Sequence, residues 1–377
     1  MSTLRTPYMS KRGHKREGMG REGCLPTAIV RTVTAATPHV APQDSTPTSE
    51  TIEVWIDCDP GHDDVIAILM ASRFTKIVGI STVAGNAPLS ATTQNALITT
   101  QLFDIDVPVY AGSDRPLVRP PVFAPSIHGT SGLAGPVLPE LIRETAPEHG
   151  VIALLHASHE HRGMWLVPTG PLTNIALALR LDPTLIERIS GISLMGGGPT
   201  FGNSTTWAEF NIWADPEAAS IVFSCGADII MCGLNVTHEV LVSIDDAEST
   251  RAVGGEKAEF LADVLDHFAT AYKDVFFTDA LGPLHDPCAV LTLTHPELFT
   301  LERLHVEIEL HGETTRGMTV VDQRRVKWGE PPNVSVAMGV RGNAVKQLIV
   351  TSLRELAQTR PRSLDATEPT GLRAVTS

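Results

Sequence analysis

Short apolar segments rich in β-branched residues alternate with segments of helical spacing over most of the chain. Residues 51–59 (TIEVWIDCD) have the composition of a buried strand, and in residues 63–73 (DDVIAILMASR) apolar side chains recur with the helical period. Strands separated by helices are typical of βαβ units, in which neighbouring strands run parallel. We therefore expect an α/β fold, with an open, mainly parallel twisted sheet and helices on both faces.

Further segments continue this alternation. We expect strands at residues 76–86, 107–112, 164–170, 189–198 and 227–237, and helices at residues 91–103, 171–181, 215–226 and about 343–357. Residues 301–310 and 316–323 have the composition of strands with little helix between them. They are expected to form an antiparallel hairpin or an edge of the sheet.

The two ends of the chain differ from this central part. The first part of residues 1–50 is basic, and the later part is rich in Pro, Ser and Thr and has few large apolar side chains. This composition predicts a disordered leader. The alternatives are a transit peptide, or a translation start at Met9 or Met19. Residues 359–377 are expected to form a disordered tail. This leaves residues 51–358 as one folded domain, and a hydrophobic content of 42% is enough for a sizeable core.

The charge of the chain limits its partners. A formal net charge of -14 argues against a nucleic-acid-binding protein, which needs a basic face to meet phosphates. No apolar run is long enough to cross a membrane. We therefore expect neither a nucleic acid nor a membrane as a partner. The cysteines form no CxxC pair and no zinc-ligand spacing, and their odd number suits the reducing cytoplasm. They are Cys24, Cys58, Cys225, Cys232 and Cys288.

Four aspartates crowd into the eight residues 57–64 (DCDPGHDD), directly after the first expected strand. Such a crowd of like charges raises the pKa of each carboxyl unless a cation lies among them. The Pro-Gly turn after Asp59 folds this residue back toward Asp63 and Asp64, and hard oxygen ligands at this density suit Ca²⁺ or Mg²⁺. The simpler alternative is that Asp63 and Asp64 only cap the helix that follows.

Other polar clusters also stand where strands are expected to end, and in open parallel sheets ligands bind beyond the carboxyl ends of the strands. Each cluster has a purely structural alternative. Asp286 could cap a helix, with His285 as an ordinary surface residue, and Glu209 and Asn211 could form turn bonds in a loop.

A set of motifs, in this order along the chain, resembles the nucleoside hydrolase family, the inosine-uridine-preferring nucleoside N-ribohydrolases. The motifs are DCDPGHDD, VAGN, IHGTSGLAG, PTGPLTNIA, MGGG, AEFNIWADPEAA and HDPCAV, and the resemblance runs from about residue 51 to residue 357. It implies an open α/β sheet, a catalytic domain over residues 51–358, a ribonucleoside substrate, a tightly bound Ca²⁺, and a homodimer or homotetramer.

The resemblance also assigns roles to individual residues. The Ca²⁺ ligands would be Asp59, Asp64, the backbone carbonyl of Thr169, and Asp286. The ribose would be held by Asp63, Asn86 and Asn211, its 5′ side by Asn203 and Glu209, and its pocket would be lined by Met195. His128 would lie near the base, or else only brace a loop.

The implied reaction is Ca²⁺-dependent hydrolysis of the N-glycosidic bond of purine or pyrimidine ribonucleosides to ribose and free base. Positive charge develops on the ribose ring in such reactions, and carboxylates around the sugar stabilise it. Ca²⁺ would orient a water and make it easier to deprotonate, with Asp59 as the general base. His285 would protonate the leaving base.

Two other functions remain open from the sequence. One is a haloacid-dehalogenase-like Mg²⁺ phosphohydrolase, whose motif also places two aspartates at a strand end, although Gly61 stands where that family has Thr or Val. The other is a non-catalytic nucleoside-binding protein. Base preference is open too, because Tyr272, Phe276 and Phe277 could stack on a base or belong to the core of an amphipathic helix.

Overall fold

The computed structural model describes residues 51–273, 275–324 and 329–359. The chain divides into two units, Met1–Ser49 and Glu50–Ser377, and all described residues belong to the second unit. The expected leader at residues 1–50, and the expected tail beyond Thr359, lie outside the described residues.

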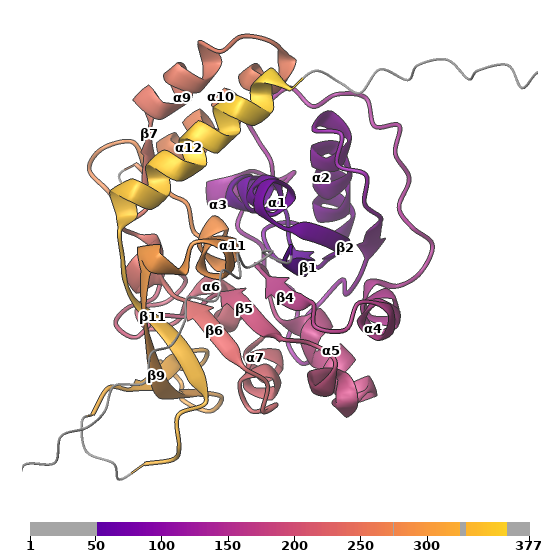
Figure 1. Ribbon diagram of the computed structural model, residues 1–377. Helices are drawn as coiled ribbons and strands as arrows, with labels where there is room; N and C mark the ends of the chain where they lie inside the picture. Colours follow the sequence, from indigo (N-terminus) through magenta and orange to yellow (C-terminus); the bar gives the residue numbers. More distant parts are fainter. Residues whose placement is uncertain (1–50, 274, 325–328, 360–377) are drawn as a thin grey trace, which may run out of the picture. The chain divides into compact units, whose positions relative to one another are not determined.

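A mainly parallel sheet forms the centre of the described unit (Figure 1), which confirms the α/β prediction. Among the described residues it has nine strands in the order β10-β9-β11-β6-β5-β4-β1-β2-β3. The strands from β11 to β3 run parallel, and β9 and β10 are antiparallel at one edge. Their bounds are β1 Glu53–Cys58, β2 Lys76–Thr82, β3 Val109–Ala111, β4 Trp165–Pro168, β5 Gly191–Met195, β6 Ile229–Cys232, β9 Phe299–Ile308, β10 Thr319–Asp322 and β11 Val334–Val340.

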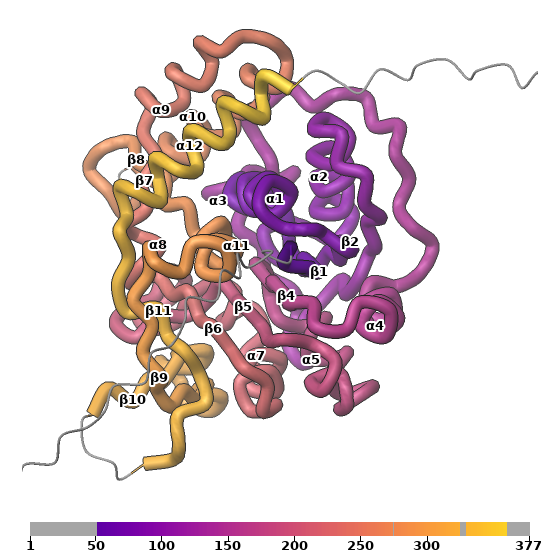
Figure 2. Tube along the Cα trace, viewed as in Figure 1, coloured from indigo at the N-terminus to yellow at the C-terminus, as the bar shows by residue number. Residues whose placement is uncertain are grey.

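Helices cover both faces of the sheet, as the Cα trace also shows (Figure 2). One face carries α1 His62–Phe74, α2 Leu89–Leu102, α10 Glu256–Tyr272, α11 Pro287–Thr294 and α12 Gly342–Gln358, and the other carries α4 Gly150–Glu160, α5 Thr173–Leu181 and α7 Pro216–Phe223. Side chains of β1 alternate between the two hydrophobic layers, as the pleat of a strand requires: Val54 and Ile56 join one layer, and Trp55 joins the other.

The remaining described elements are short, and the longest of them is α9, a helix of eight residues. They are α3 Pro125–His128, α6 Phe210–Ala214, α8 Leu234–Thr237, α9 Ile244–Arg251, the 3₁₀ turns Pro183–Glu187 and Pro296–Leu298, and the hairpin of β7 Leu241–Ser243 and β8 Leu281–Pro283. In the part of the chain that the structure describes, no helix is long and apolar enough to cross a membrane.

The expected hairpin at residues 301–310 and 316–323 is confirmed as β9 and β10, which pair antiparallel at the sheet edge. Several elements lie outside the segments expected from sequence, among them α4, α10 and β11. β11 inserts between β9 and β6, pairing antiparallel with one and parallel with the other. Such a position depends on pairing between distant parts of the chain, which local composition does not indicate.

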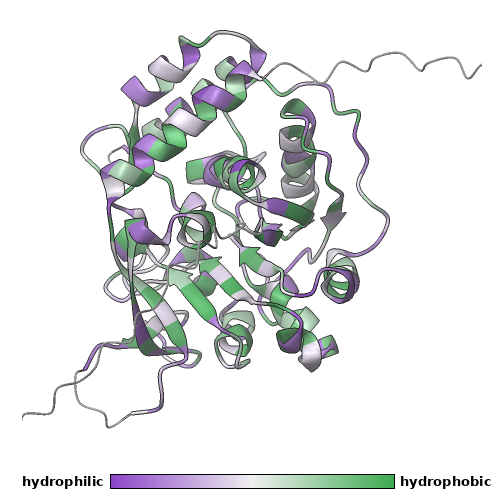
Figure 3. Cartoon of the chain, viewed as in Figure 1, coloured by the Kyte–Doolittle hydropathy of each residue, from purple (hydrophilic) through white to green (hydrophobic). Residues whose placement is uncertain are grey.

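Helix α1 is buried along most of its length, and Figure 3 shows apolar residues on it and on the central strands. Every residue from His62 to Ala71 is buried, including the two aspartates of its first turn. A helix enclosed on all sides by packing is held in a fixed place. It therefore fixes the position of the aspartate-rich loop at its N-terminus.

Candidate active site

The polar clusters converge at the carboxyl end of the parallel strands, where they line a cavity of about 280 Å³. Ten of the residues expected at the site line it: Asp63, Asn86, His128, Thr169, Met195, Asn203, Glu209, Asn211, His285 and Asp286. The other two, Asp59 and Asp64, are fully buried beside it. Segments far apart in the sequence thus meet in one place.

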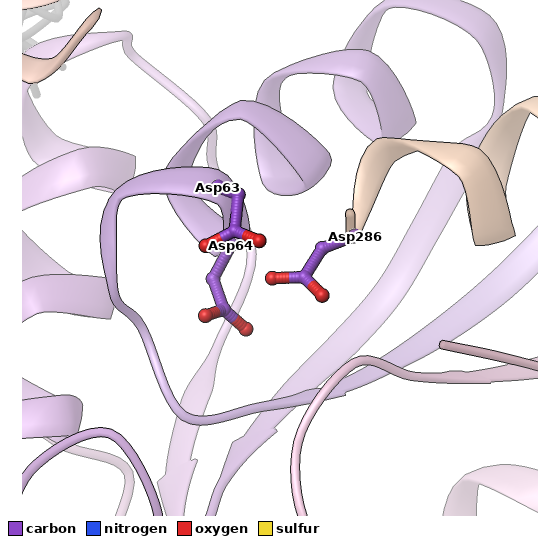
Figure 4. A group of neighbouring side chains, drawn as sticks. All are labelled: Asp63, Asp64 and Asp286. Carbon is purple, nitrogen blue, oxygen red and sulfur yellow. The ribbon is translucent and has the colours of Figure 1, made fainter. Parts of the chain in front are cut away.

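Three aspartates point toward one another in the wall of this cavity (Figure 4). Carboxylate oxygens of Asp63, Asp64 and Asp286 lie within 4.8 Å of one another, and all three residues are buried. Asp63 and Asp64 belong to the first turn of α1, whereas Asp286 immediately precedes α11. The packing of α1 against α11 brings the three carboxylates together.

Asp64 does cap a helix, whereas Asp286 makes no capping hydrogen bond. The Asp64 carboxylate accepts the backbone N–H groups of Asp59 at 3.3 Å and Gly61 at 3.0 Å, which closes a capping box at the start of α1. It also accepts the Thr169 hydroxyl at 2.7 Å. Asp286 stands at the N-cap of α11, yet its side chain accepts no capping hydrogen bond. Its carboxylate is directed toward the other aspartates instead.

Asp59 has one satisfied and one unsatisfied carboxylate oxygen. Its Oδ2 accepts the backbone N–H of Asn86 at 2.6 Å, while its Oδ1 is buried without a hydrogen-bond partner in the described residues. Gly85 and Gly170 press against this carboxylate so closely that a Cβ at either position would collide with it. A buried, unpaired carboxylate oxygen is costly, and a cation bound there would satisfy it.

Burial raises the pKa of each clustered carboxyl, and the charge of neighbouring aspartates adds to the rise for Asp59, Asp63 and Asp286. The pKa of Asp63 is raised to about 8, first by burial and then by Asp64. The pKa values of Asp59 and Asp286 are raised well above the ordinary range for the same two reasons. Oxygen-only donors with this much negative charge fit a hard divalent cation such as Ca²⁺ or Mg²⁺, and no His or Cys joins the group.

The cavity wall opposite this cluster is built around α6. The alternative of turn bonds in a loop does not describe this segment, because Glu209 is the N-cap of α6 and Asn211 lies in its first turn. The Glu209 carboxylate accepts the N–H groups of Gly197, Asn211 and Ile212, and burial raises its pKa to about 7. Capping is therefore a real role of Glu209, and it holds the carboxylate at the cavity.

Amide side chains complete this wall. The Asn211 amide donates to the carbonyl oxygen of Thr169 at 2.6 Å and to that of Met195 at 3.2 Å, which links the ends of β4 and β5. The Asn203 side chain accepts the N–H of Phe210 at 2.8 Å. These side chains are oriented by fixed hydrogen bonds before any substrate binds.

His285 is buried, so the alternative of an ordinary surface residue is wrong. Its Nδ1 lies 2.7 Å from the Thr237 hydroxyl, and its Nε2 lies 3.1 Å from the Tyr272 hydroxyl. Burial, with a smaller contribution from His238, lowers the pKa of His285 well below its usual range. The ring is therefore neutral at neutral pH, held between two hydroxyl groups.

The sequence left open whether Tyr272, Phe276 and Phe277 stack on a base or belong to the core, and the structure places them differently. Tyr272 is the last residue of α10 and is buried in the core, yet it also lines the cavity, as Phe276 does. Phe277 packs against His238, with ring centroids 5.5 Å apart. The motifs assign no role to Thr237 or Trp213, because the placement of these two residues depends on α8 and α6.

His128, at the end of α3, both lines the cavity and braces a loop. Its Nδ1 contacts Nδ1 of His62 at 3.1 Å, and Nε2 of His62 contacts the carbonyl oxygen of Ala134 at 2.8 Å. Burial lowers the pKa of His128 well below its usual range and that of His62 to about 4. Both imidazoles are therefore neutral.

The position of Asp57 does not favour the phosphohydrolase alternative. Its carboxylate Oδ1 accepts hydrogen bonds from the Ser81 hydroxyl at 2.5 Å and the Asn174 amide at 2.8 Å. The side chain is fully buried and does not line the cavity. It is not placed to attack a phosphate that binds there.

Comparison with known proteins identifies the family. Residues 54–347 match the inosine-uridine preferring nucleoside hydrolase family. The chain is 42% identical over 309 residues to the pyrimidine-specific ribonucleoside hydrolase RihA of Shewanella oneidensis, covering 80% of this chain and 96% of that protein. It is 40% identical over 309 residues to RihA of Escherichia coli strain SMS-3-5 / SECEC, covering 80% and 98%.

Solved structures agree with this match. The purine-preferring ribonucleoside hydrolase from Gardnerella vaginalis has a TM-score of 0.76 at 32% identity, covering 81% of this chain and 99% of that chain. The plant nucleoside hydrolase PpNRh1 has a TM-score of 0.73 at 30% identity, again covering 81% and 99%. The chain therefore belongs to the inosine-uridine preferring nucleoside hydrolase family and is a hydrolase of N-glycosyl bonds.

Proposed function

We propose that this enzyme hydrolyses pyrimidine ribonucleosides to ribose and free base, with Ca²⁺ held by its aspartate cluster. The observation that carries the proposal is the group of buried carboxylates of Asp63, Asp64 and Asp286, with the unpaired oxygen of Asp59 beside it, at a cavity lined by amide and carboxylate groups. The preference for pyrimidines is supported by two relatives at 40% and 42% identity that are described as pyrimidine-specific.

The metal ligands in this proposal are Asp59, Asp64, the Thr169 carbonyl and Asp286. Asp59 and Asp64 are fully buried beside the cavity, whereas Thr169 and Asp286 line it together with Asp63, which in this proposal meets a ribose hydroxyl. When bound, Ca²⁺ would offset the charge of the carboxylates and make a nearby water more acidic. Only oxygen donors are available in this set, as that ion prefers.

The protein groups then divide the work of hydrolysis. Asp59 accepts a proton from the attacking water through its unpaired Oδ1. Asp63, Asn86 and Asn211 hold the ribose hydroxyls. Asn203 and Glu209 hold the 5′ side of the sugar, and Met195 lines the sugar pocket. Carboxylates on several sides stabilise the positive charge that develops on the ring, because they lie in a buried, weakly screening environment.

His285 is the proposed donor to the leaving base. To act as an acid the ring must first take up a proton and become imidazolium, because a neutral imidazole is too weak an acid to protonate the base. The hydroxyl groups of Thr237 and Tyr272 hold both of its nitrogens in place. A proton that His285 gives to the base can be replaced through the Tyr272 hydroxyl, which is within hydrogen-bond distance of Nε2.

Replacing His285 by Ala tests this role. We expect kcat to fall by about 10²-fold on uridine, because the base then leaves without a proton. The loss on p-nitrophenyl riboside should be much smaller, since nitrophenolate leaves without protonation. Steady-state rates on both substrates make the comparison. Equal losses on the two would remove His285 from the acid role.

A panel of ribonucleosides tests the substrate class. We expect kcat/KM for uridine or cytidine to exceed that for inosine, guanosine and adenosine by about tenfold or more, measured as ribose released. 2′-Deoxyuridine is the matched control, and it should react poorly because the groups that hold the 2′ hydroxyl lose their partner. Faster hydrolysis of a purine nucleoside would contradict the pyrimidine assignment.

The cytoplasmic location and the homodimer or homotetramer remain predictions. Four cysteines of the described residues, Cys58, Cys225, Cys232 and Cys288, are free, which supports a reducing compartment.

A further inference from the structure

We infer that Thr319 is a positioning residue for the 5′ side of the sugar pocket, because it holds the glycine loop that orients Glu209. The glycine loop consists of residues 196–198, which directly follow β5. The two hydrogen bonds between the Thr319 hydroxyl and the backbone of Gly198 carry this inference. That the cavity binds a ribose, with Glu209 at its 5′ side, rests on the proposed function.

The glycine loop needs anchors from other elements. Glycine loses more conformational freedom on folding than any other residue, and Gly197 has a φ of +69°, in the left-handed region. Elements β6 and α8 hold the first part of the loop: the Gly196 N–H donates to the Cys232 carbonyl oxygen at 3.1 Å, and the Gly197 carbonyl accepts the Leu234 N–H at 2.9 Å. The backbone groups of Gly198 are buried beyond these anchors and need a partner of their own.

Thr319 is that partner. Its hydroxyl accepts the N–H of Gly198 and donates to the carbonyl oxygen of the same residue, both at 2.8 Å. Thr319 is the first residue of β10 and is 1% exposed. Its methyl group also packs on the loop, since a Cβ added to Gly197 would lie 2.5 Å from it. Removal of the hydroxyl would therefore leave a buried donor and a buried acceptor unpaired.

The glycine loop transmits this anchoring to the cavity. The N–H of Gly197 donates to Oε2 of Glu209 at 2.9 Å, and the N–H of Ile212 donates to the same oxygen at 3.1 Å. Glu209 lines the cavity, as does Met195, which immediately precedes the loop. Thr319 does not line it. Thr319 therefore acts on the sugar pocket through the glycine loop and Glu209, without touching the substrate.

The position of Thr319 is itself fixed by the packing of the antiparallel edge. Strand β10 lies at the end of the sheet, beside β9 (Figure 2). The segment before it packs on α6, where a Cβ added to Gly317 would lie 2.9 Å from Cα of Trp213. Arg316 forms an ion pair with Glu217 of α7. The edge strands thus support the sugar pocket as well as extending the sheet.

Thr319→Val tests this role, because it keeps the shape of the side chain and removes the hydroxyl. The substrates are uridine and 5′-deoxyuridine, which lacks the 5′ hydroxyl. In the wild-type protein kcat/KM for uridine should exceed that for 5′-deoxyuridine by about 100-fold, since the analogue leaves the polar groups of the site unpaired. Thr319→Val should lower kcat/KM for uridine by about tenfold and that for 5′-deoxyuridine by less than about threefold. Thr319→Ser, which retains the hydroxyl, should restore the wild-type preference.

Thr292→Val is the matched control. Thr292 is also buried, and its hydroxyl donates to the Ala289 carbonyl at 3.0 Å and lies 3.0 Å from the Ser193 hydroxyl on β5. Loss of this hydroxyl should lower the Tm without changing the preference for uridine over 5′-deoxyuridine. Equal losses on the two substrates in Thr319→Val, or no loss on either, would overturn the positioning role.

Hydrogen exchange of backbone amides, measured by NMR on the full chain, tests the anchoring itself. The Gly198 amide should exchange slowly in the wild-type protein and in Thr319→Ser, and at least about tenfold faster in Thr319→Val. Fast exchange at Gly198 in the wild-type protein would overturn the inference even if Thr319→Val does not fold. This measurement needs no turnover. A wild-type protein that releases no ribose would sink the proposed function, while the exchange rate would still decide whether Thr319 holds the loop.

Discussion

Replacing Asp59 by Asn is expected to lower kcat for ribonucleoside hydrolysis by about 10³-fold or more while leaving the fold intact. In the wild-type protein the backbone N–H of Asn86 donates to Oδ2 of Asp59. In the variant the amide oxygen of Asn can accept the same N–H. The other carboxylate oxygen, which has no hydrogen-bond partner among the described residues, becomes an NH₂ group that can neither accept a proton from water nor bind a cation. The substitution thus removes the chemistry and keeps the structural hydrogen bond.

Asp57→Asn provides the control for this experiment. Asp57 stands two residues earlier at the end of the same strand, and it is equally buried. Its Oδ1 accepts from Ser81 and Asn174 and can remain an amide oxygen, while its Oδ2 is unpaired. Both variants replace one buried carboxyl by an amide close to the end of β1. We expect Asp57→Asn to retain activity, with circular dichroism showing that both are folded. An Asp59→Asn enzyme with undiminished kcat would eliminate Asp59 as the base.

Removal of Ca²⁺ by a strong chelator is expected to abolish ribose release and to lower the Tm by several degrees. The ion offsets the repulsion among buried carboxylates, and a ligand present at one hundred times its Kd stabilises the folded state by about 2.7 kcal/mol. Re-addition of Ca²⁺ should restore both properties. Restoration by Mg²⁺ alone would identify a different ion, and full activity in the chelated protein would contradict a metal-dependent mechanism.

The stability of the chelated protein should also depend on pH in a defined direction. The pKa of Asp63 rises from 3.8 to about 8 on folding, chiefly because the carboxyl is buried. The folded state therefore binds more protons than the unfolded chain between these values, and the free energy of unfolding falls as pH rises through this window. A thermal melt of the chelated protein should give a higher Tm at pH 6 than at pH 8.

The Ca²⁺-loaded protein is the control for this pH dependence. A bound cation favours the ionised carboxylates and lowers their pKa, which removes the proton uptake on folding. Its Tm should change much less between pH 6 and pH 8, and the stabilisation by Ca²⁺ should be larger at pH 8. A chelated protein that is more stable at pH 8 than at pH 6 would show that the carboxylates are compensated in some other way.

The sequence alone was sufficient for the parallel core and the aspartate-rich loop. The alternation of strand and helix, with side chains repeating at periods of 2 and 3.6, is a local property, and it correctly indicated β1, α1 and the antiparallel edge of β9 and β10. The rule that ligands bind at the carboxyl ends of parallel strands then indicated which polar clusters meet. The motifs supplied the residues that line the cavity.

Only the tertiary structure decided the contacts between those clusters. Asp64 caps α1, whereas the side chain of Asp286 makes no capping hydrogen bond at the start of α11. Both are aspartates at the start of a helix, so the sequence does not distinguish them. The partners of His285 and the contact between His62 and His128 likewise depend on how separate elements pack. Local sequence determines periodicity and turns, but the packing of the whole core determines which groups distant along the chain become hydrogen-bond partners. These partners in turn set the charge and tautomer of each buried group.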